Sequence, residues 1–191
     1  MRRSPSRAII TNLAPNHLDV HKDMDEYVAA KKNIFRHQTG ENLLILNADN
    51  AITADFWGNG ITHFFSRQGK VSHICLKDGM IYRGDVPVLD IRDILLPGVH
   101  NIENYMAAIA AVEGIVSDDT VRRVAKTFGG VEHRIELVRI KDGVRFYNDS
   151  IASSPSRTIA GLRSFSRKVI LIAGGYDKHI PYDVLGPEIC A

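Results

Sequence analysis

Short apolar runs alternate with amphipathic segments along the chain, a pattern that predicts an α/β fold. The runs Ala8–Leu13 and Leu43–Asn47 are apolar almost throughout, as expected of strands buried on both faces of a sheet. Between them, Asp23 and Glu26 have the spacing of a capping box and predict the start of a helix. Further short strands are expected at 61–65, 71–76, 80–83 and 86–91, and helices after Pro97-Gly98 and from Asp118 to Gly129-Gly130.

A domain boundary is expected near 130–134, and a second set of elements follows it. A strand at 135–140, the turn Lys141-Asp142-Gly143 and a return strand from Val144 predict a hairpin. A polar loop then leads to Ser154 as N-cap and Pro155 as first residue of a helix reaching about Phe165. The apolar run Val169–Ala173 predicts one more strand, and the chain ends within or just after another helix.

Composition limits the class of protein. The net charge of +2 gives no reason to expect nucleic acid or an anionic membrane surface as a partner. No apolar run approaches the roughly 20 residues that span a bilayer. The basic start is not followed by the long apolar segment of a secretory signal. Cys75 and Cys190 form no CxxC pattern, so we expect reduced thiols and a cytoplasmic protein.

Several polar residues are candidates for chemistry, each beside an ordinary alternative. The strand–loop–helix stretch 144–158 is the kind of connection that binds charged ligands, because free backbone N–H groups point outward at a helix start. Lys31 falls on the apolar face of its helix, where it must snorkel, pair or be chemically changed. His17 and His21 are four residues apart and could share a metal ion, although no third ligand is fixed. Asn101 and Asn104 are candidates either as helix caps or as contacts to a base or ribose. Arg134 is either an ordinary surface charge or a phosphate ligand. The pair Gly174-Gly175 is a weak signal for anion binding.

Six motifs occur in order along the chain: Asn16-His17-Leu18-Asp19, Ala29-Ala30-Lys31, His100-Asn101-Ile102-Glu103-Asn104, Glu132-His133-Arg134, Asn148-Asp149-Ser150 and Gly174-Gly175-Tyr176-Asp177-Lys178. Together they resemble the Mur ligases, and among them the members that add D-glutamate to UDP-N-acetylmuramoyl-L-alanine. The resemblance spans about Ala8 to Leu185 and leaves Met1–Arg7 unmatched.

The resemblance implies a fold, a reaction and a set of site residues. Residues 1–132 would be the C-terminal portion of an ATPase-type central domain with a mixed sheet, and 133–191 the first part of a Rossmann-like domain. The implied reaction uses ATP and Mg²⁺: the substrate carboxylate is phosphorylated, and the amine of D-glutamate then attacks the acyl phosphate to form an amide. The implied roles are His17 and Lys31, as a carbamate, on Mg²⁺ and in catalysis; Asn101, Asn104, Arg134 and Asp149 on ATP; and Ser153 and Lys178 on D-glutamate.

Departures from the family pattern limit what these residues are expected to do alone. The sequence contains no GxxxxGK[ST] loop, and Ile151 stands where some members have a lysine. We therefore expect the isolated chain to be inactive, as a fragment or as part of a split ligase whose remainder is a partner. The alternatives are a non-catalytic nucleotide-binding remnant and a Mur ligase that adds a different amino acid.

Overall fold

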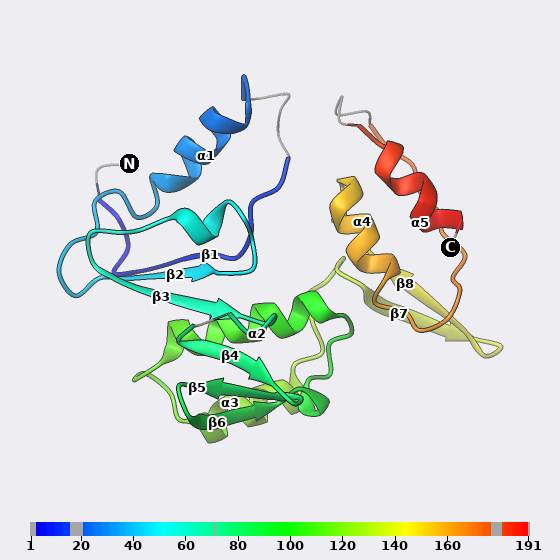
Figure 1. Cartoon of the computed structure of the whole chain (residues 1–191). Helices are drawn as coiled ribbons and strands as arrows, with labels where there is room; N and C mark the ends of the chain where they lie inside the picture. Colours follow the sequence, from blue (N-terminus) through cyan, green and yellow to red (C-terminus); the bar gives the residue numbers. More distant parts are fainter. Residues whose placement is uncertain (1–2, 16–20, 71, 177–180, 191) are drawn as a thin grey trace.

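A six-stranded mixed sheet forms the centre of the protein, shown by a computed structural model that describes residues 3–15, 21–70, 72–176 and 181–190 (Figure 1). The strands lie in chain order, β1 to β6. The first four run parallel, and β5 and β6 are antiparallel to their neighbours. The strands are β1 (Arg7–Ile10), β2 (Leu43–Asn47), β3 (Ile61–Ser66), β4 (Ile74–Lys77), β5 (Met80–Arg83) and β6 (Val86–Asp90).

Helices cover both faces of this sheet, which explains why β2 is buried at every position. One face packs on α1 (Met24–Lys32) through Leu44, Leu46 and Tyr27. The opposite face packs on α2 (Val99–Val112) and α3 (Asp118–Thr127). Its core residues include Ile45, Phe65 and Met106, all at 0% exposure. The predicted α/β class is confirmed.

Local sequence signals account for several element ends. Asp23 caps α1, its Oδ1 accepting from the Glu26 N–H at 2.9 Å, as expected. The hairpin β7 (Glu136–Lys141) and β8 (Val144–Asn148) turns through Asp142 and Gly143, which have φ of 51° and 79°. Positive φ at both residues of a two-residue loop matches the twist of the paired strands.

The C-terminal elements form a smaller group beside the main sheet. They comprise the β7–β8 hairpin, α4 (Pro155–Leu162), a 3₁₀ turn at Asp183–Leu185 and α5 (Gly186–Cys190). Two further 3₁₀ turns, Thr53–Asp55 and Ile91–Asp93, lie earlier in the chain. Ser154 occupies the N-cap position of α4 and Pro155 its first turn, as expected, although the Ser154 hydroxyl makes no capping bond. The proposed boundary between 1–132 and 133–191 falls between the two sheets and stays a prediction.

The expected strand at Val169–Ala173 is wrong. This segment has no regular structure, and Ile170 and Ile172 are 96% and 95% exposed. A strand needs a neighbour that receives its backbone hydrogen bonds, and β7 and β8 pair only with each other among the described residues.

Ser4, Ser6 and Arg7, which precede Ala8, are part of the fold. Leu43 donates its backbone N–H to the Ser6 carbonyl at 2.7 Å, and His37 donates to Ser4 Oγ at 3.0 Å. Arg7 opens β1 and donates to the carbonyls of Ala111 and Glu113, the latter at 2.9 Å. Over the described residues, no helix is long and apolar enough to cross a membrane.

Candidate functional site

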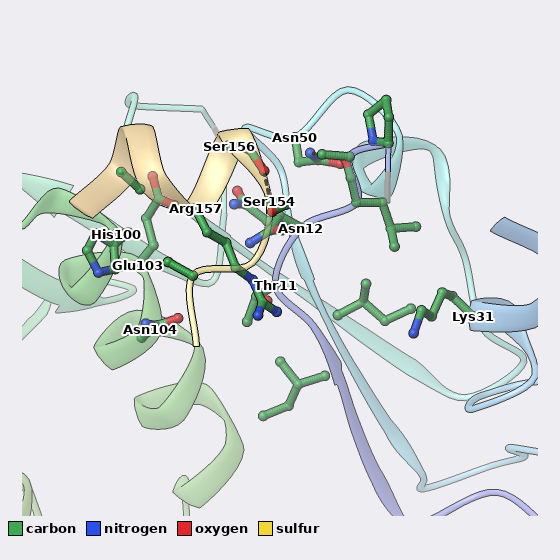
Figure 2. Close-up of a pocket in the computed structure, with 18 of the residues that line it drawn as sticks. Thr11, Asn12, Lys31, Asn50, His100, Glu103, Asn104, Ser154, Ser156 and Arg157 are labelled. Carbon is green, nitrogen blue, oxygen red and sulfur yellow. Dashed lines mark hydrogen bonds between the residues drawn. The ribbon is translucent and has the colours of Figure 1, made fainter. Parts of the chain in front are cut away.

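A cavity of about 1010 Å³ lies where the parallel strands β1 and β2 end (Figure 2). Its lining comes from the chain after these strands, the start of α2, the loop before β7 and the segment from β8 into α4. The carboxyl edge of a parallel sheet is the usual ligand-binding edge of an α/β protein. Lining residues with polar side chains include Thr11, Asn12, Lys31, Asp49, Asn50, His100, Glu103, Asn104, Arg134, Asp149, Ser154, Ser156 and Arg157.

Asp49 organises the edge of the cavity just beyond β2. Its carboxylate accepts from the Ser66 hydroxyl at 2.7 Å and from the backbone N–H groups of Arg67 and Gln68 at 2.6 and 3.1 Å. Asn50 donates to the Leu13 carbonyl at 3.0 Å and so joins the ends of β1 and β2. These bonds hold the ends of β1, β2 and β3 in fixed positions at the edge of the cavity.

The start of α2 supplies the next wall. Asn101 is buried and donates to the Pro97 carbonyl at 2.7 Å, so it stabilises the entry to the helix and does not line the cavity. Its Oδ1 accepts from Asn104 at 3.2 Å, and Asn104 lies exposed on the cavity wall. Glu103 accepts from Arg67 Nε at 2.9 Å. Asn101 is thus placed to orient Asn104.

His100 also lines the cavity, beside charges from three elements. Burial is the main cause that lowers the pKa of His100, and the Arg134 cation lowers it further. Asp149 and Glu103 act in the opposite direction. Arg134 and Asp149 line the same cavity as His100, so these C-terminal residues lie close to the start of α2.

Asp149 joins the loop before β7 to the loop after β8. Its Oδ1 accepts from the Ile135 N–H at 3.1 Å. A Cβ placed on Gly161 of α4 would lie 2.8 Å from Asp149 Oδ2, so the absent side chain lets this carboxylate approach the helix. Arg134, Ile135, Asp149 and Gly161 all line the cavity.

Lys31 extends from α1 at the cavity margin, and its side chain is exposed. Its Nζ lies 5.1 Å from the centroid of the Tyr27 ring, a cation–π distance. The lysine therefore avoids burial of its charge by reaching solvent along an aromatic face, the snorkelling alternative. Its expected neighbour His17 lies outside the described residues.

The other predicted site residues are divided between the described and undescribed parts of the chain. Lys178 lies outside the described residues, like His17. Ser153 is exposed beside α4 and does not line the cavity, whereas its neighbour Ser154 does. Ile151 lines it and is 46% exposed. Gly174 and Gly175 are exposed, away from the cavity lining.

Sequence reasoning missed several residues that the structure brings together. Asp49 and Asn50 directly follow a buried strand, and that position was the available signal. Arg157 points toward the cavity from the first turns of α4 (Figure 2). Nothing in its spacing distinguishes it from an ordinary surface arginine.

Comparison with known proteins identifies the fold and the relatives. The family model for the Mur ligase middle domain matches residues 2–112. The chain belongs to the Mur ligase family. The match begins at residue 2, so the expectation that Met1–Arg7 lie outside the family pattern is wrong.

Curated relatives carry one function in their names. The chain is 59% identical over 196 residues to the UDP-N-acetylmuramoylalanine–D-glutamate ligase of Acetivibrio thermocellus. This alignment covers 99% of the chain and 42% of the relative. The chain is 50% identical over 192 residues to the ligase of the same name from Clostridium kluyveri, covering 98% of the chain and 42% of the relative. The chain thus spans about two-fifths of the length of these relatives.

Solved Mur ligases share the fold at low sequence identity. MurF from Acinetobacter baumannii superposes with a TM-score of 0.70 at 19% identity, over 84% of this chain and 37% of that one. MurF from Thermotoga maritima, solved in complex with ADP, gives a TM-score of 0.65 at 19% identity, over 86% and 40% of the two chains.

The donors around the cavity suit a nucleotide better than they suit a metal ion alone. Arg134 and Arg157 offer guanidinium groups for phosphate, while Asn104 and Asp149 offer an amide and a carboxylate for a base or ribose. For Mg²⁺, the described lining offers no trio of convergent His, Cys, Asp or Glu ligands. The expected roles of Lys31, as a carbamate, and of His17 in holding Mg²⁺ stay predictions, and His17 lies outside the described residues.

Proposed function

We propose that this chain is a portion of an ATP-dependent ligase that adds D-glutamate to UDP-N-acetylmuramoyl-L-alanine in peptidoglycan precursor synthesis. The observation that carries the proposal is the 59% identity to a ligase of that name over almost the whole chain. The cavity supports it, because residues from both halves of the chain line one space large enough for a nucleotide.

In this proposal the cavity holds ATP between the main sheet and the C-terminal elements. Asp149 accepts a hydrogen bond from a ribose hydroxyl, since Oδ1 retains a lone pair after accepting from Ile135. Arg134 balances phosphate charge, and Asn104, oriented by Asn101, contacts the nucleotide. Magnesium, when bound, offsets charge on the transferring phosphoryl group.

The proposed ligation has two chemical steps. A carboxylate oxygen of the UDP-linked substrate attacks the γ-phosphorus of ATP, and ADP leaves. The amine of D-glutamate then attacks the acyl carbon, inorganic phosphate leaves and the amine loses a proton. Ser153 and Lys178 are the residues of this chain proposed to contact D-glutamate, with Lys178 pairing with a carboxylate.

The 191 residues by themselves are proposed to be inactive. They contain no GxxxxGK[ST] loop, the element that cradles the β- and γ-phosphates in P-loop enzymes. Purified chain incubated with ATP, Mg²⁺, the UDP-linked substrate and D-glutamate should release no phosphate above background. D-Glutamate-dependent release would contradict this part of the proposal.

A chimera tests the functional assignment itself. The chain would replace the corresponding segment of the Acetivibrio thermocellus ligase, which is 59% identical over 196 residues. We expect D-glutamate-dependent phosphate release from this chimera, and a loss of at least tenfold in kcat/KM when it carries Asp149→Ala. A folded chimera without activity would favour a non-catalytic remnant, and activity with another amino acid in place of D-glutamate would contradict the substrate assignment.

A further inference from the structure

A second polar cluster lies at the edge of the main sheet opposite the cavity. It comprises His63 from the first half of β3, His73 just before β4 and Glu113 at the C-terminal end of α2. One ligand atom from each of the three lies within 4.8 Å of the others. Within the described part of the chain, no other three His, Cys, Asp or Glu side chains come this close.

The two imidazoles face each other, and one of them lacks a partner. The rings of His63 and His73 stack with centroids 3.8 Å apart and an interplanar angle of 27°. His73 Nε2 lies 2.6 Å from Glu113 Oε2. His63 Nδ1 is buried from solvent without a hydrogen-bond partner. A buried polar atom without a partner calls for an explanation, such as an ion that the fold is built to hold.

The charge state of His63 suits a ligand. Burial is the main cause that lowers the pKa of His63, and the neighbouring His73 lowers it further, while Glu113 raises it. A lowered pKa keeps the ring neutral near pH 7, and the neutral ring is the form that coordinates metals.

The surroundings of Glu113 leave its carboxylate available. Arg83 Nε lies 3.5 Å from Glu113 Oε1, but the same guanidinium forms two hydrogen bonds with Asp118 at 3.1 and 3.0 Å. Arg7 donates to the Glu113 backbone carbonyl rather than to its side chain. Glu113 therefore shares one arginine with a second carboxylate, and its own negative charge faces the two imidazoles.

We propose that His63, His73 and Glu113 bind a divalent transition-metal ion such as Zn²⁺. Two imidazoles and one carboxylate are a common donor set for zinc, with water as the fourth ligand. An ion about 2.0 Å from each donor in tetrahedral geometry requires donor atoms roughly 3.3 Å apart. The His73–Glu113 contact of 2.6 Å would open and the widest separation, within 4.8 Å, would shorten, both within the reach of side-chain rotation. The ion would link β3, the start of β4 and the end of α2.

The alternative is a His73–Glu113 ion pair with His63 merely stacked on it, and metal titration separates the two. The purified 191-residue chain, freed of metal with a chelator, would be titrated at pH 7.5 with Zn²⁺ by calorimetry and with Co²⁺ by visible absorption. We expect one tight equivalent, d–d absorption typical of a low-symmetry site and a higher Tm with Zn²⁺. Lowering the pH below 6 should weaken binding because protons compete for the imidazoles.

Matched variants locate the ion. His63→Ala, His73→Ala and Glu113→Gln should each weaken the tight equivalent at least tenfold and remove the Zn²⁺-dependent rise in Tm. His37→Ala, at an exposed histidine elsewhere, and His21→Ala, at the other candidate metal pair, should bind like the unchanged chain. Circular dichroism checks that each variant folds. If a histidine variant unfolds, Glu113→Gln still tests the proposal, since glutamine preserves the size of the side chain and an acceptor oxygen. No tight equivalent in the unchanged chain, or unaltered binding by Glu113→Gln, would overturn the proposal.

Discussion

Asp149 Oδ1 accepts a hydrogen bond from the backbone N–H of Ile135 at 3.1 Å, and Ile135 has a φ of 46°. A β-branched residue in the left-handed region is unfavourable, so the surrounding structure must hold it there. The bond joins the two loops that flank the β7–β8 hairpin, beside the cavity. Asp149 therefore has a structural task in addition to its proposed contact with ribose.

Replacing Asp149 should separate these two tasks. Asp149→Ala removes the acceptor of the Ile135 N–H and should lower the free energy of unfolding by about 1.5 kcal/mol. Asp149→Asn keeps an acceptor oxygen and should cost less than half as much, because only the charge is lost. Chemical denaturation measures both, and hydrogen exchange at the Ile135 amide should accelerate in Asp149→Ala alone. Equal exchange in the two variants would show that the bond does not hold the loop.

Gly161 should tolerate alanine poorly despite its helical position. In most helices Gly→Ala stabilises by about 0.5–1 kcal/mol. At Gly161 the new Cβ would lie 2.8 Å from Asp149 Oδ2, so the carboxylate must move and the Ile135 bond is disturbed. We expect a net loss of about 1 kcal/mol. Gly186→Ala in α5 is the matched control, since a Cβ there meets nothing within 4 Å; equal effects at both positions would contradict the account.

Lys31 and Lys32 offer a paired test of the expected carbamate. Lys31 borders the cavity, whereas Lys32 has its Nζ 4.3 Å from the Phe56 ring centroid and is not part of the lining. Incubation with ¹³C-bicarbonate and Mg²⁺ should give a carbamate signal by ¹³C NMR. Lys31→Arg should abolish the signal because a guanidinium does not form a carbamate under these conditions, and Lys32→Arg should retain it. A signal that survives Lys31→Arg would place the modification elsewhere.

The histidine at the start of α2 should make stability depend on pH. Burial, with help from Arg134, lowers the pKa of folded His100 below its ordinary value of 6.5. As the pH falls, His100 therefore binds a proton in the unfolded chain before it does so in the folded chain. The stability that neutral His100 contributes above pH 6.5 is lost as the pH falls through the pKa of the folded chain. The slope of Tm against pH between 7 and 5 should be shallower in His100→Gln. An unchanged slope would show that His100 does not titrate differently in the two states.

Elements specified by local signals were predictable from the sequence. The bounds of β2 and β5 follow from their apolar runs, and the β7–β8 turn from Asp142-Gly143. The absence of a strand at Val169–Ala173 was not predictable, because strand pairing depends on a neighbour distant in sequence rather than on the apolar run itself.

The residues of the candidate site were likewise predictable from the sequence only in part. The family resemblance implies Lys31, Asn104, Arg134 and Asp149 as site residues, and all four line one cavity, whereas Asn101 and Ser153, also implied, do not. Asp49 and Arg157 were missed since their direction depends on packing, which spacing along one element does not reveal. The pairing of His63 with His73 has the same origin: parallel alignment of β3 and β4 brings together residues from separate segments.

The cavity at the ends of β1 and β2 is proposed to bind a nucleotide. Amide chemical shifts of the ¹⁵N-labelled chain, followed by NMR during titration with ADP to millimolar concentration, test it most directly and detect weak binding. We predict saturable shifts at Asn104, Arg134 and Ile135, at least tenfold weaker binding in Arg134→Ala, and no change in affinity in Arg139→Ala, an exposed arginine on β7 outside the cavity lining. Absence of shifts at these residues, or equal binding by the two arginine variants, would contradict the account.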